Sequence, residues 1–238
     1  MKSINNSINN SINNNIIISI EGNIGSGKSS LIETLHLLKL DDKFKPIIFL
    51  KEPVDEWGEI VDENNNSILQ LFYQSPEEYS FSFQMMAYIS RLNNLKKALN
   101  ENHNTIIITE RSLYTDKYVF AQMLYDDNKI RKVDYSIYLK WFDSFINEIP
   151  IVHKVIYVNT DPKICLERIG IRLRTGEANI SIEYLNNCHA YHNSLLSIYM
   201  KTIDVSDIYI YNGNIDKEAA YLKMNDLISF IFDFHDTI

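Results

Sequence analysis

The chain has 238 residues, 31 acidic against 23 basic side chains, and a formal net charge of −8. This length suits one domain with a substantial core. The acidic balance argues against a nucleic-acid backbone as the main partner. No apolar run approaches the ~18 residues that a membrane-spanning helix needs. We therefore expect neither a nucleic-acid nor a membrane partner.

Residues 1–15 are a low-complexity tract of Ser, Ile and Asn. We expect a disordered tail there and one folded domain over residues 16–238. The tract lacks the Arg-rich pattern of a mitochondrial transit peptide and the apolar segment of a secretory signal, so a cytoplasmic location is expected. Cys165 and Cys188 have no metal-type spacing and are expected to be free thiols.

Short β-branched runs alternate with longer helical patterns along the rest of the chain. The expected strands are 16–20, 46–50, 105–109, 155–158 and 208–211. The expected helices are 30–40, 76–99, 113–125, 135–146, 162–171, 181–200 and 217–234. This alternation predicts an α/β fold, a five-stranded parallel sheet with helices on both faces. Ligands of such sheets bind beyond the carboxyl ends of the strands.

The first expected strand runs into a turn that fits the pattern G-x-x-x-x-G-K-[ST]. Glycines let the backbone wrap around a phosphate with its N–H groups pointing inward, and the next helix adds its positive dipole end. Lys28 is expected to reach the β- and γ-phosphates, and the Ser29 hydroxyl to bind Mg²⁺. The predicted ATP-binding residues of this loop are Gly22, Asn23, Ile24, Gly25, Ser26, Gly27, Lys28, Ser29 and Ser30.

Acidic residues follow the second and third expected strands. Glu52 is a candidate to accept a proton from a substrate hydroxyl. Glu110 is placed to hold Mg²⁺ opposite Lys28, and Arg111 is a candidate to orient Glu52 or to hold a phosphate oxygen. A surface acid before the turn residue Pro53, and a strand-end ion pair, are the alternatives that the sequence leaves open.

Polar side chains on two helices form a possible base-binding set. Gln84, Ala87 and Arg91 share one face of the second expected helix, and Asp116 and Phe120 lie four residues apart on the third. Gln84, Arg91 and Asp116 together can read the edge of a base. The rings that can flank its faces are Phe120 with Phe72 or Trp57. The alternative is a buried Arg91–Asp116 ion pair that binds no ligand.

Three arginines, Arg168, Arg172 and Arg174, lie near the end of the helix expected at 162–171. Arginines at this spacing can close over a triphosphate and stabilise charge during phosphoryl transfer. A solvated basic helix face is the alternative. The sequence thus predicts an Arg-rich lid over the phosphate loop.

Taken in chain order, these segments resemble the deoxynucleoside kinase family, in its deoxycytidine/deoxyguanosine kinase branch. The matching segments are 21–29, 52–54 with Trp57, 71–73, 83–84, 90–92, 110–116, 172–174 with Glu177, and 182–185. The resemblance covers about residues 16–235. It implies a P-loop kinase fold, ATP as phosphoryl donor with Mg²⁺ as cofactor, a deoxynucleoside as acceptor, and a homodimer.

The resemblance also implies roles by position. Glu52 is similar to the general base on the 5′-hydroxyl, with Arg111 as its partner, Lys28 as a third catalytic residue and Glu110 on the Mg²⁺ side. Tyr73 with Glu177 matches the pair that binds the sugar 3′-hydroxyl, and Arg172 with Arg174 falls in the lid over the ATP phosphates. The implied substrate-binding residues are Glu52, Trp57, Phe72, Tyr73, Gln84, Ala87, Arg91, Arg111, Asp116, Phe120 and Glu177.

The Arg91–Asp116 pair offers donors beside an acceptor, which suits the amino group of adenine, guanine or cytosine. Thymine has no amino group, so weak thymidine activity is expected. Small Ala87 leaves room for a purine, which favours deoxyguanosine or deoxyadenosine over deoxycytidine. The rival hypotheses are a nucleoside monophosphate kinase of thymidylate-kinase type and a P-loop regulatory protein that binds NTP.

Overall fold

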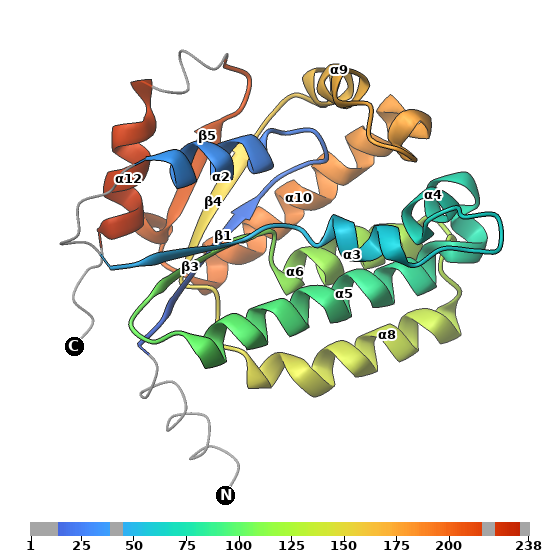
Figure 1. Cartoon of the computed structure of the whole chain (residues 1–238), viewed down its shortest axis with the longest axis horizontal. Helices are drawn as coiled ribbons and strands as arrows, with labels where there is room; N and C mark the ends of the chain where they lie inside the picture. Colours follow the sequence, from blue (N-terminus) through green and yellow to red (C-terminus); the bar gives the residue numbers. More distant parts are fainter. Residues whose placement is uncertain (1–13, 39–44, 216–221, 234–238) are drawn as a thin grey trace, which may run out of the picture.

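The computed structural model describes residues 14–38, 45–215 and 222–233 (Figure 1). Five parallel strands form one sheet in the order β2-β3-β1-β4-β5. The strands are β1 (Ile16–Glu21), β2 (Ile47–Leu50), β3 (Ile106–Glu110), β4 (Lys154–Asn159) and β5 (Ile208–Asn212). The predicted α/β fold is confirmed, and each expected strand is present with ends that differ by at most one residue.

Helices connect the strands. They are α2 (Lys28–Leu37), α3 (Val54–Glu59), α4 (Ile68–Gln74), α5 (Pro76–Glu101), α6 (Leu113–Thr115), the π-helical η1 (Asp116–Ala121), α7 (Gln122–Asp126), α8 (Lys132–Phe145), α9 (Pro162–Arg172), α10 (Ile182–Thr202) and α12 (Met224–Phe232). Short 3₁₀ turns are η2 (Ile146–Glu148), η3 (Glu177–Asn179) and η4 (Val205–Asp207). No helix in these ranges is long and apolar enough to cross a membrane.

Some expectations fall on residues that the structure does not describe. These are residues 1–13 of the expected tail, the end of the helix expected at 30–40, and residues 217–221 and 234 of the last expected helix. Asn15 is described, and its side chain bonds to both sides of the turn before β3. It donates to the Asn102 carbonyl at 2.7 Å and accepts from the Thr105 N–H at 3.0 Å.

Apolar side chains cover both faces of the sheet. On one face, Ile18, Ile20 and their neighbours pack against α2 and α12. On the other, Ile17 and Ile107 pack against α5, η1 and α10. Figure 1 shows α2 and α12 across the sheet from α5, α8 and α10. The predicted helices on both faces are confirmed.

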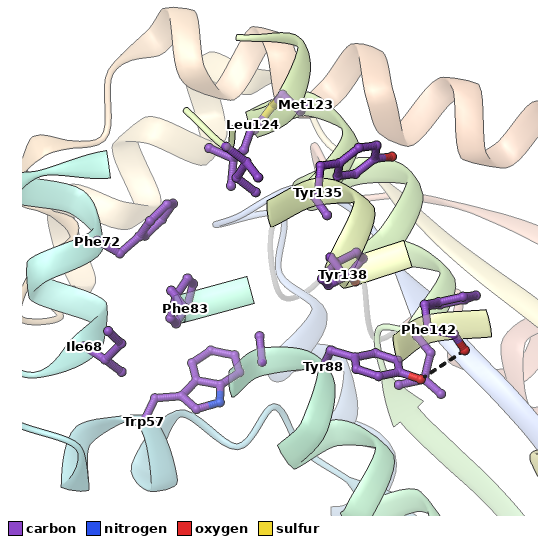
Figure 2. Packing of buried hydrophobic residues seen from close by; sticks show 14 of the residues in the cluster. Trp57, Ile68, Phe72, Phe83, Tyr88, Met123, Leu124, Tyr135, Tyr138 and Phe142 are labelled. Atoms are coloured by element: carbon purple, nitrogen blue, oxygen red, sulfur yellow. Dashed lines mark hydrogen bonds between the residues drawn. The ribbon is translucent and has the colours of Figure 1, made fainter. Parts of the chain in front are cut away.

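A second hydrophobic core lies between the helices, away from the sheet (Figure 2). It joins Trp57 of α3, Phe72 of α4 and Phe83 of α5 to the residues of α7 and α8. Phe72 stacks on Phe83 with ring centroids 4.8 Å apart, and Trp57 meets Phe83 edge-on at 5.2 Å. This core fixes the helices that form one wall of the site.

Three helical segments differ from the sequence expectation. Helices α3 and α4 were not predicted, although Ser67 and Gln70 form a capping box at the start of α4, a recognisable sequence signal. The helix expected at 113–125 contains a π-helical turn at Asp116–Ala121. Such turns are frequent at functional sites, and this one carries Asp116 and Phe120.

Candidate active site

A cavity of about 540 Å³ opens beyond the carboxyl ends of β1, β2 and β3. The glycine-rich loop, residues 22–30, follows β1. Glu52 stands two residues after β2, and Glu110 ends β3. We call this loop with the lid, residues 168–179, the donor half of the site. The acceptor half consists of Glu52, helices α3 to α5 and residues 110–120.

The loop backbone takes positive φ angles at Gly22 (142°) and Gly25 (74°). A Cβ atom would lie 2.6 Å from the Val158 carbonyl oxygen at Gly22, and 2.5 Å from the Cys165 carbonyl oxygen at Gly25. Both distances are too short for any side chain, so only glycine fits. The loop therefore closes tightly against β4 and α9, in the form that a phosphate cradle needs.

Lys28 lies under this loop and is only 4 % exposed. Its Nζ donates to the Asn23 carbonyl at 2.8 Å. Burial and the nearby charge of Arg111 lower the pKa of Lys28 to about 7, and Glu110 and Glu52 oppose this effect. The pocket around the lysine is thus suited to an anion, whose charge would stabilise the ammonium form.

The side chains of Ser29 and Glu110 meet at the mouth of the cavity. The Ser29 hydroxyl donates to Glu110 Oε1 at 2.9 Å. Within the described residues no group of three or more His, Cys, Asp or Glu could hold a metal ion. Mg²⁺ binds through one or two protein oxygens when phosphates and water supply the rest, so a hydroxyl beside a carboxylate fits this ion.

Glu52 is held by two arginines. Arg111 Nη1 donates to Glu52 Oε1, and Arg91 Nη2 lies 3.3 Å from the same oxygen. Burial alone would raise the pKa of Glu52. The charges of Arg111, Arg91 and Lys28 outweigh burial and lower the pKa to about 2. The carboxylate is therefore ionised at neutral pH, and the contact with Arg111 that the sequence suggested is present.

Arg91 also joins the acceptor half to β3. Its Nε donates to Asp116 Oδ2 at 2.9 Å and its Nη1 to the Glu110 carbonyl at 2.7 Å. Burial raises the pKa of Asp116, and the ion pair with Arg91 opposes this. The Arg91–Asp116 ion pair is buried, as the alternative without a ligand also predicts. Both side chains nevertheless line the cavity. The pair is therefore placed to meet a ligand.

Gln84 brings a free acceptor to the same wall. It is buried, and its Oε1 has no hydrogen-bond partner in the part of the chain that the structure describes. A buried carbonyl oxygen without a donor costs free energy. A ligand N–H group would satisfy it. Ala87, one helical turn further along α5, also lines the cavity.

Aromatic rings form the remaining surface of the acceptor half. Trp57, Phe72 and Phe83 gather as Figure 2 shows, and all three line the cavity. Phe120 also lines it, and the Arg111 guanidinium lies 5.1 Å from the centre of the Phe120 ring. Flat apolar walls around a few polar groups are typical of small-molecule sites.

In the lid, the arginines contact protein groups. Arg172 makes two hydrogen bonds to Glu177, of 2.6 Å from Nε to Oε2 and 2.5 Å from Nη2 to Oε1. Arg174 Nη1 lies 3.4 Å from Glu177 Oε1. Arg168 instead donates to the carbonyls of Ser26 and Gly213, at 3.1 and 2.9 Å, and so supports the phosphate loop.

The cavity brings together most of the residues that the sequence singled out. Those that line it are Ile24, Gly25, Gly27, Lys28, Ser29, Ser30, Glu52, Trp57, Phe72, Tyr73, Gln84, Ala87, Arg91, Glu110, Arg111, Asp116, Phe120, Arg172, Arg174 and Glu177. Gly22, Asn23 and Ser26 belong to the loop but do not line the cavity; they shape the loop. The Asn23 side chain, for example, donates to the Leu185 carbonyl at 2.9 Å.

The cavity also has lining residues that were not predicted as site residues. They are Glu33, Leu69, Phe83, Ile171 and Tyr184. Arg168, which the sequence placed among the lid arginines, lines the cavity as well. The capping box before α4 could have pointed to Leu69, which sits in its first turn. Phe83 adjoins Gln84 in an aromatic run. For Glu33 and Ile171 we find no signal in the sequence.

Comparison with known proteins agrees with this geometry. The Deoxynucleoside kinase family matches residues 18–231 of the chain. The chain is 33% identical to human deoxycytidine kinase over 198 residues, which are 75% of this chain and 74% of the relative. It is 34% identical to a probable deoxycytidine kinase of fowlpox virus over 220 residues, 91% and 87% of the two chains. It is 29% identical to the mitochondrial deoxyguanosine kinase of Xenopus laevis over 206 residues, 79% and 75%.

Proposed function

Since the chain belongs to the deoxynucleoside kinase family, and is thus a nucleoside kinase with ATP as its donor, we propose that it phosphorylates the 5′-hydroxyl of a purine deoxynucleoside for nucleotide salvage. The main support is the position of Glu52. An ionised carboxylate shares one cavity with a phosphate loop and its lysine. That arrangement suits transfer of a phosphoryl group to a hydroxyl.

In the proposed reaction, Glu52 accepts the proton of the 5′-hydroxyl as the oxygen attacks the γ-phosphorus in line. With a pKa of about 2, Glu52 is a weak base. In a loose transition state little proton transfer is needed before the new bond forms, so positioning of the hydroxyl matters more than basicity. Arg111, which grips Glu52, holds the carboxylate at that position and adds positive charge beside the transferred group.

The donor half would hold the triphosphate. Lys28 and the loop N–H groups bind the β- and γ-phosphates, and Arg172 and Arg174 close from the lid. Mg²⁺ held by Ser29 and Glu110 would neutralise phosphate charge. The hydrogen bond between these two side chains supports the assignment.

The base fits the acceptor half, and the sugar fits between that half and the lid. We assign the 3′-hydroxyl to Tyr73 and Glu177, which both line the cavity. Burial, with the charge of Glu177, raises the pKa of Tyr73, so its hydroxyl keeps its proton and can donate. Gln84, Arg91 and Asp116 read the base edge between the rings of Phe120 and Phe72 or Trp57.

Base preference follows from the polar groups on that wall. The unpaired Gln84 oxygen and the Asp116 carboxylate both accept, so they favour a base that carries an N–H donor on the edge facing them. Thymine has a ring N–H but no amino group: it carries a carbonyl oxygen where cytosine has its amino group, and a methyl group on the next carbon. One buried acceptor would therefore face an oxygen and stay unsatisfied. Ala87 supports deoxyguanosine or deoxyadenosine, with deoxycytidine as a poorer possibility and thymidine as the poorest substrate.

We also propose a homodimer. Val133, Ile137 and Trp141 recur every four residues along α8 and are exposed, and Ile89 is exposed on the neighbouring helix α5. An apolar stripe of this kind is typical of helix pairing between subunits. Sedimentation of the purified protein tests it, because Trp141→Glu would yield monomers. The cytoplasmic location stays a prediction that cell fractionation tests.

The function itself is tested by a phosphorylation panel. Purified protein with ATP and Mg²⁺ is offered each of the four deoxynucleosides, and the products are separated by chromatography. We expect monophosphate from the purine deoxynucleosides and little from thymidine. Diphosphate made from an added monophosphate, with no reaction of nucleosides, would favour the monophosphate kinase. No product and no heat of nucleoside binding would favour the regulatory protein.

A further inference from the structure

Glu21, the last residue of β1, has a buried carboxylate that is outside the lining of the cavity. It is 2 % exposed, and within the described residues only neutral groups donate to it. Burying a carboxylate without a cation is costly, and neutral hydrogen bonds offset this only in part. Buried groups that cost stability in this way tend to occur where a protein needs them for its function.

The donors to Glu21 come from four separate elements. Its Oε1 accepts from Ser19 Oγ in β1 at 2.7 Å, from the Ser112 N–H after β3 at 3.1 Å, and from the Tyr199 hydroxyl in α10 at 3.3 Å. Thr115 Oγ1 in α6 donates to Oε2. The carboxylate thus joins the start of the phosphate loop to the turn after β3.

That turn contains Arg111 in a strained conformation. Its φ is +64°, in the left-handed region that strains a non-glycine residue. Two successive N–H groups of the turn bond to the end of β1. The Arg111 N–H donates to the Ile20 carbonyl at 2.9 Å, and the Ser112 N–H donates to Glu21. Of these two acceptors, only Glu21 is a side chain.

We propose that Glu21 is a positioning residue for phosphoryl transfer, because its carboxylate holds the turn that directs Arg111 onto Glu52. Glu21 itself does not touch the cavity and acts through Arg111. The inference rests on the proposed function, since that function gives Arg111 its task. A positioning role also explains why a carboxylate is buried here without a cation, which costs stability.

The direct test is Glu21→Gln, which keeps the size of the side chain and removes the negative charge. The amide oxygen can still accept from the turn, but the bond is weaker without the negative charge, so that Arg111 can relax. We expect kcat to fall about 10- to 100-fold, because small misplacement of a catalytic group has effects of that order. KM for nucleoside and for ATP should stay within about threefold, since the lost contact acts mainly in the transition state. Thermal unfolding measured in parallel reports the folded fraction.

Ser19→Ala is the matched control. It removes an equally buried bond to the same Glu21 oxygen but leaves the turn untouched, so kcat should stay within about twofold. Tyr199→Phe is a milder variant, in case Glu21→Gln does not fold. It removes a donor to Glu21 and the 2.8 Å bond to the Ser112 hydroxyl, and should lower kcat by about threefold with KM unchanged.

A folded Glu21→Gln protein with normal kcat would overturn the inference, as would an equal loss in Ser19→Ala. A crystal structure of Glu21→Gln gives an answer independent of activity. We expect the φ angle of Arg111 to become negative and its guanidinium to lose the contact with Glu52. A structure that keeps both the positive φ and the contact contradicts the inference. If the wild type phosphorylates no nucleoside, the proposed function fails, while this structure still decides the role of Glu21 in holding the turn.

Discussion

In the acceptor half, Arg91 and Arg111 bond to Glu52, Asp116 and the end of β3, and all five groups lie within the buried wall of the cavity. In the lid, Arg172 and Arg174 bond to Glu177, and the adjacent Ile171 and Leu173 are 80 % and 83 % exposed. The half that we propose binds the nucleoside is therefore assembled without a ligand. Under the proposed roles, the lid arginines have to leave Glu177 before they bind phosphate.

The backbone shows the same difference. Leu173 ends α9 with φ +49°, and Gly176 follows at +91°, so the lid has a left-handed residue on each side of Arg174. Strain at exposed positions is easily released when a segment moves. Strain at Arg111, in contrast, is held by bonds to β1 on a buried turn. Pre-formed charge networks lower the reorganisation that a reaction requires, and this one belongs to the half in which we propose that Glu52 accepts the proton.

The largest expected effect comes from Glu52→Gln, which removes the negative charge that Arg91 and Arg111 contact in the acceptor half. Loss of a general base lowers kcat by about 10²- to 10⁴-fold, and nucleoside binding should be largely kept because the base-reading wall is intact. Steady-state kinetics with calorimetry of nucleoside binding checks both. Asp55→Asn, an exposed change three residues along, is the control. Near-normal turnover in Glu52→Gln would remove Glu52 as the base.

The double variant Arg91→Met with Asp116→Ala tests specificity. Thymidine should gain at least about tenfold in kcat/KM relative to the purine deoxynucleosides, since the rejecting acceptors are gone. Total activity should fall, because Arg91 also supports Glu52 and the Glu110 carbonyl. Competition assays with mixed nucleosides measure the ratio. Lys96→Met with Glu148→Ala removes an exposed ion pair as the control, and an unchanged ranking of substrates in the site variant would make the Arg91–Asp116 pair purely structural.

Glu177→Gln tests the lid. If Glu177 binds the 3′-hydroxyl, KM for the deoxynucleoside should rise about 10-fold or more, the usual worth of a hydrogen bond to a charged group. A 2′,3′-dideoxynucleoside lacks that hydroxyl, so the wild type should bind it with a higher KM than the deoxynucleoside. This difference in KM should largely vanish in the variant. Glu167→Gln, an exposed change on α9, is the control. Additive effects of the mutation and the missing hydroxyl would place the 3′-hydroxyl elsewhere.

The smallest effect concerns His192, which packs edge-on against Phe120 of the acceptor half and Tyr157 of β4. Burial, with the charges of Arg111 and Lys28, holds the pKa of His192 well below its usual value. Below about pH 6.5 the unfolded chain binds a proton that the folded chain does not. The free energy of unfolding should therefore fall by about 1.4 kcal/mol per pH unit from this residue.

Denaturant unfolding of the wild type and His192→Phe between pH 7.5 and 5 measures that slope. The variant should lose stability less steeply as the pH falls, and His103→Phe, at an exposed position, should follow the wild type. Parallel curves for the wild type and His192→Phe would show that His192 binds a proton equally in both states.

The sheet and the phosphate loop could be predicted because their signals are local. β-branched runs mark the strands, and Gly22 to Ser29 are contiguous. Glu52, Gln84, Arg91 and Asp116 were found because a strand end or a helix face places them. The bond between Glu21 and the turn after β3 joins residues 91 positions apart, and no periodicity reveals it.

The lid shows a different limit of sequence reasoning. Arg172 and Arg174 were identified, but their bonds to Glu177 depend on a left-handed residue at Leu173 that no local rule predicts. The π-helical turn at Asp116 was also missed, because its extra residue per turn looks like ordinary helix in the sequence. In each case the contact is set by tertiary packing.

A crystal structure with deoxyguanosine and a non-hydrolysable ATP analogue tests the contrast between the two halves most directly. We expect Glu52, Arg91 and Arg111 to stay within about 1 Å of their positions in the free protein, the usual range for a pre-formed site. Arg172 should leave Glu177 and bond to a phosphate oxygen. A rearranged Glu52 network, or an Arg172 that remains on Glu177 beside the bound phosphates, would contradict the account.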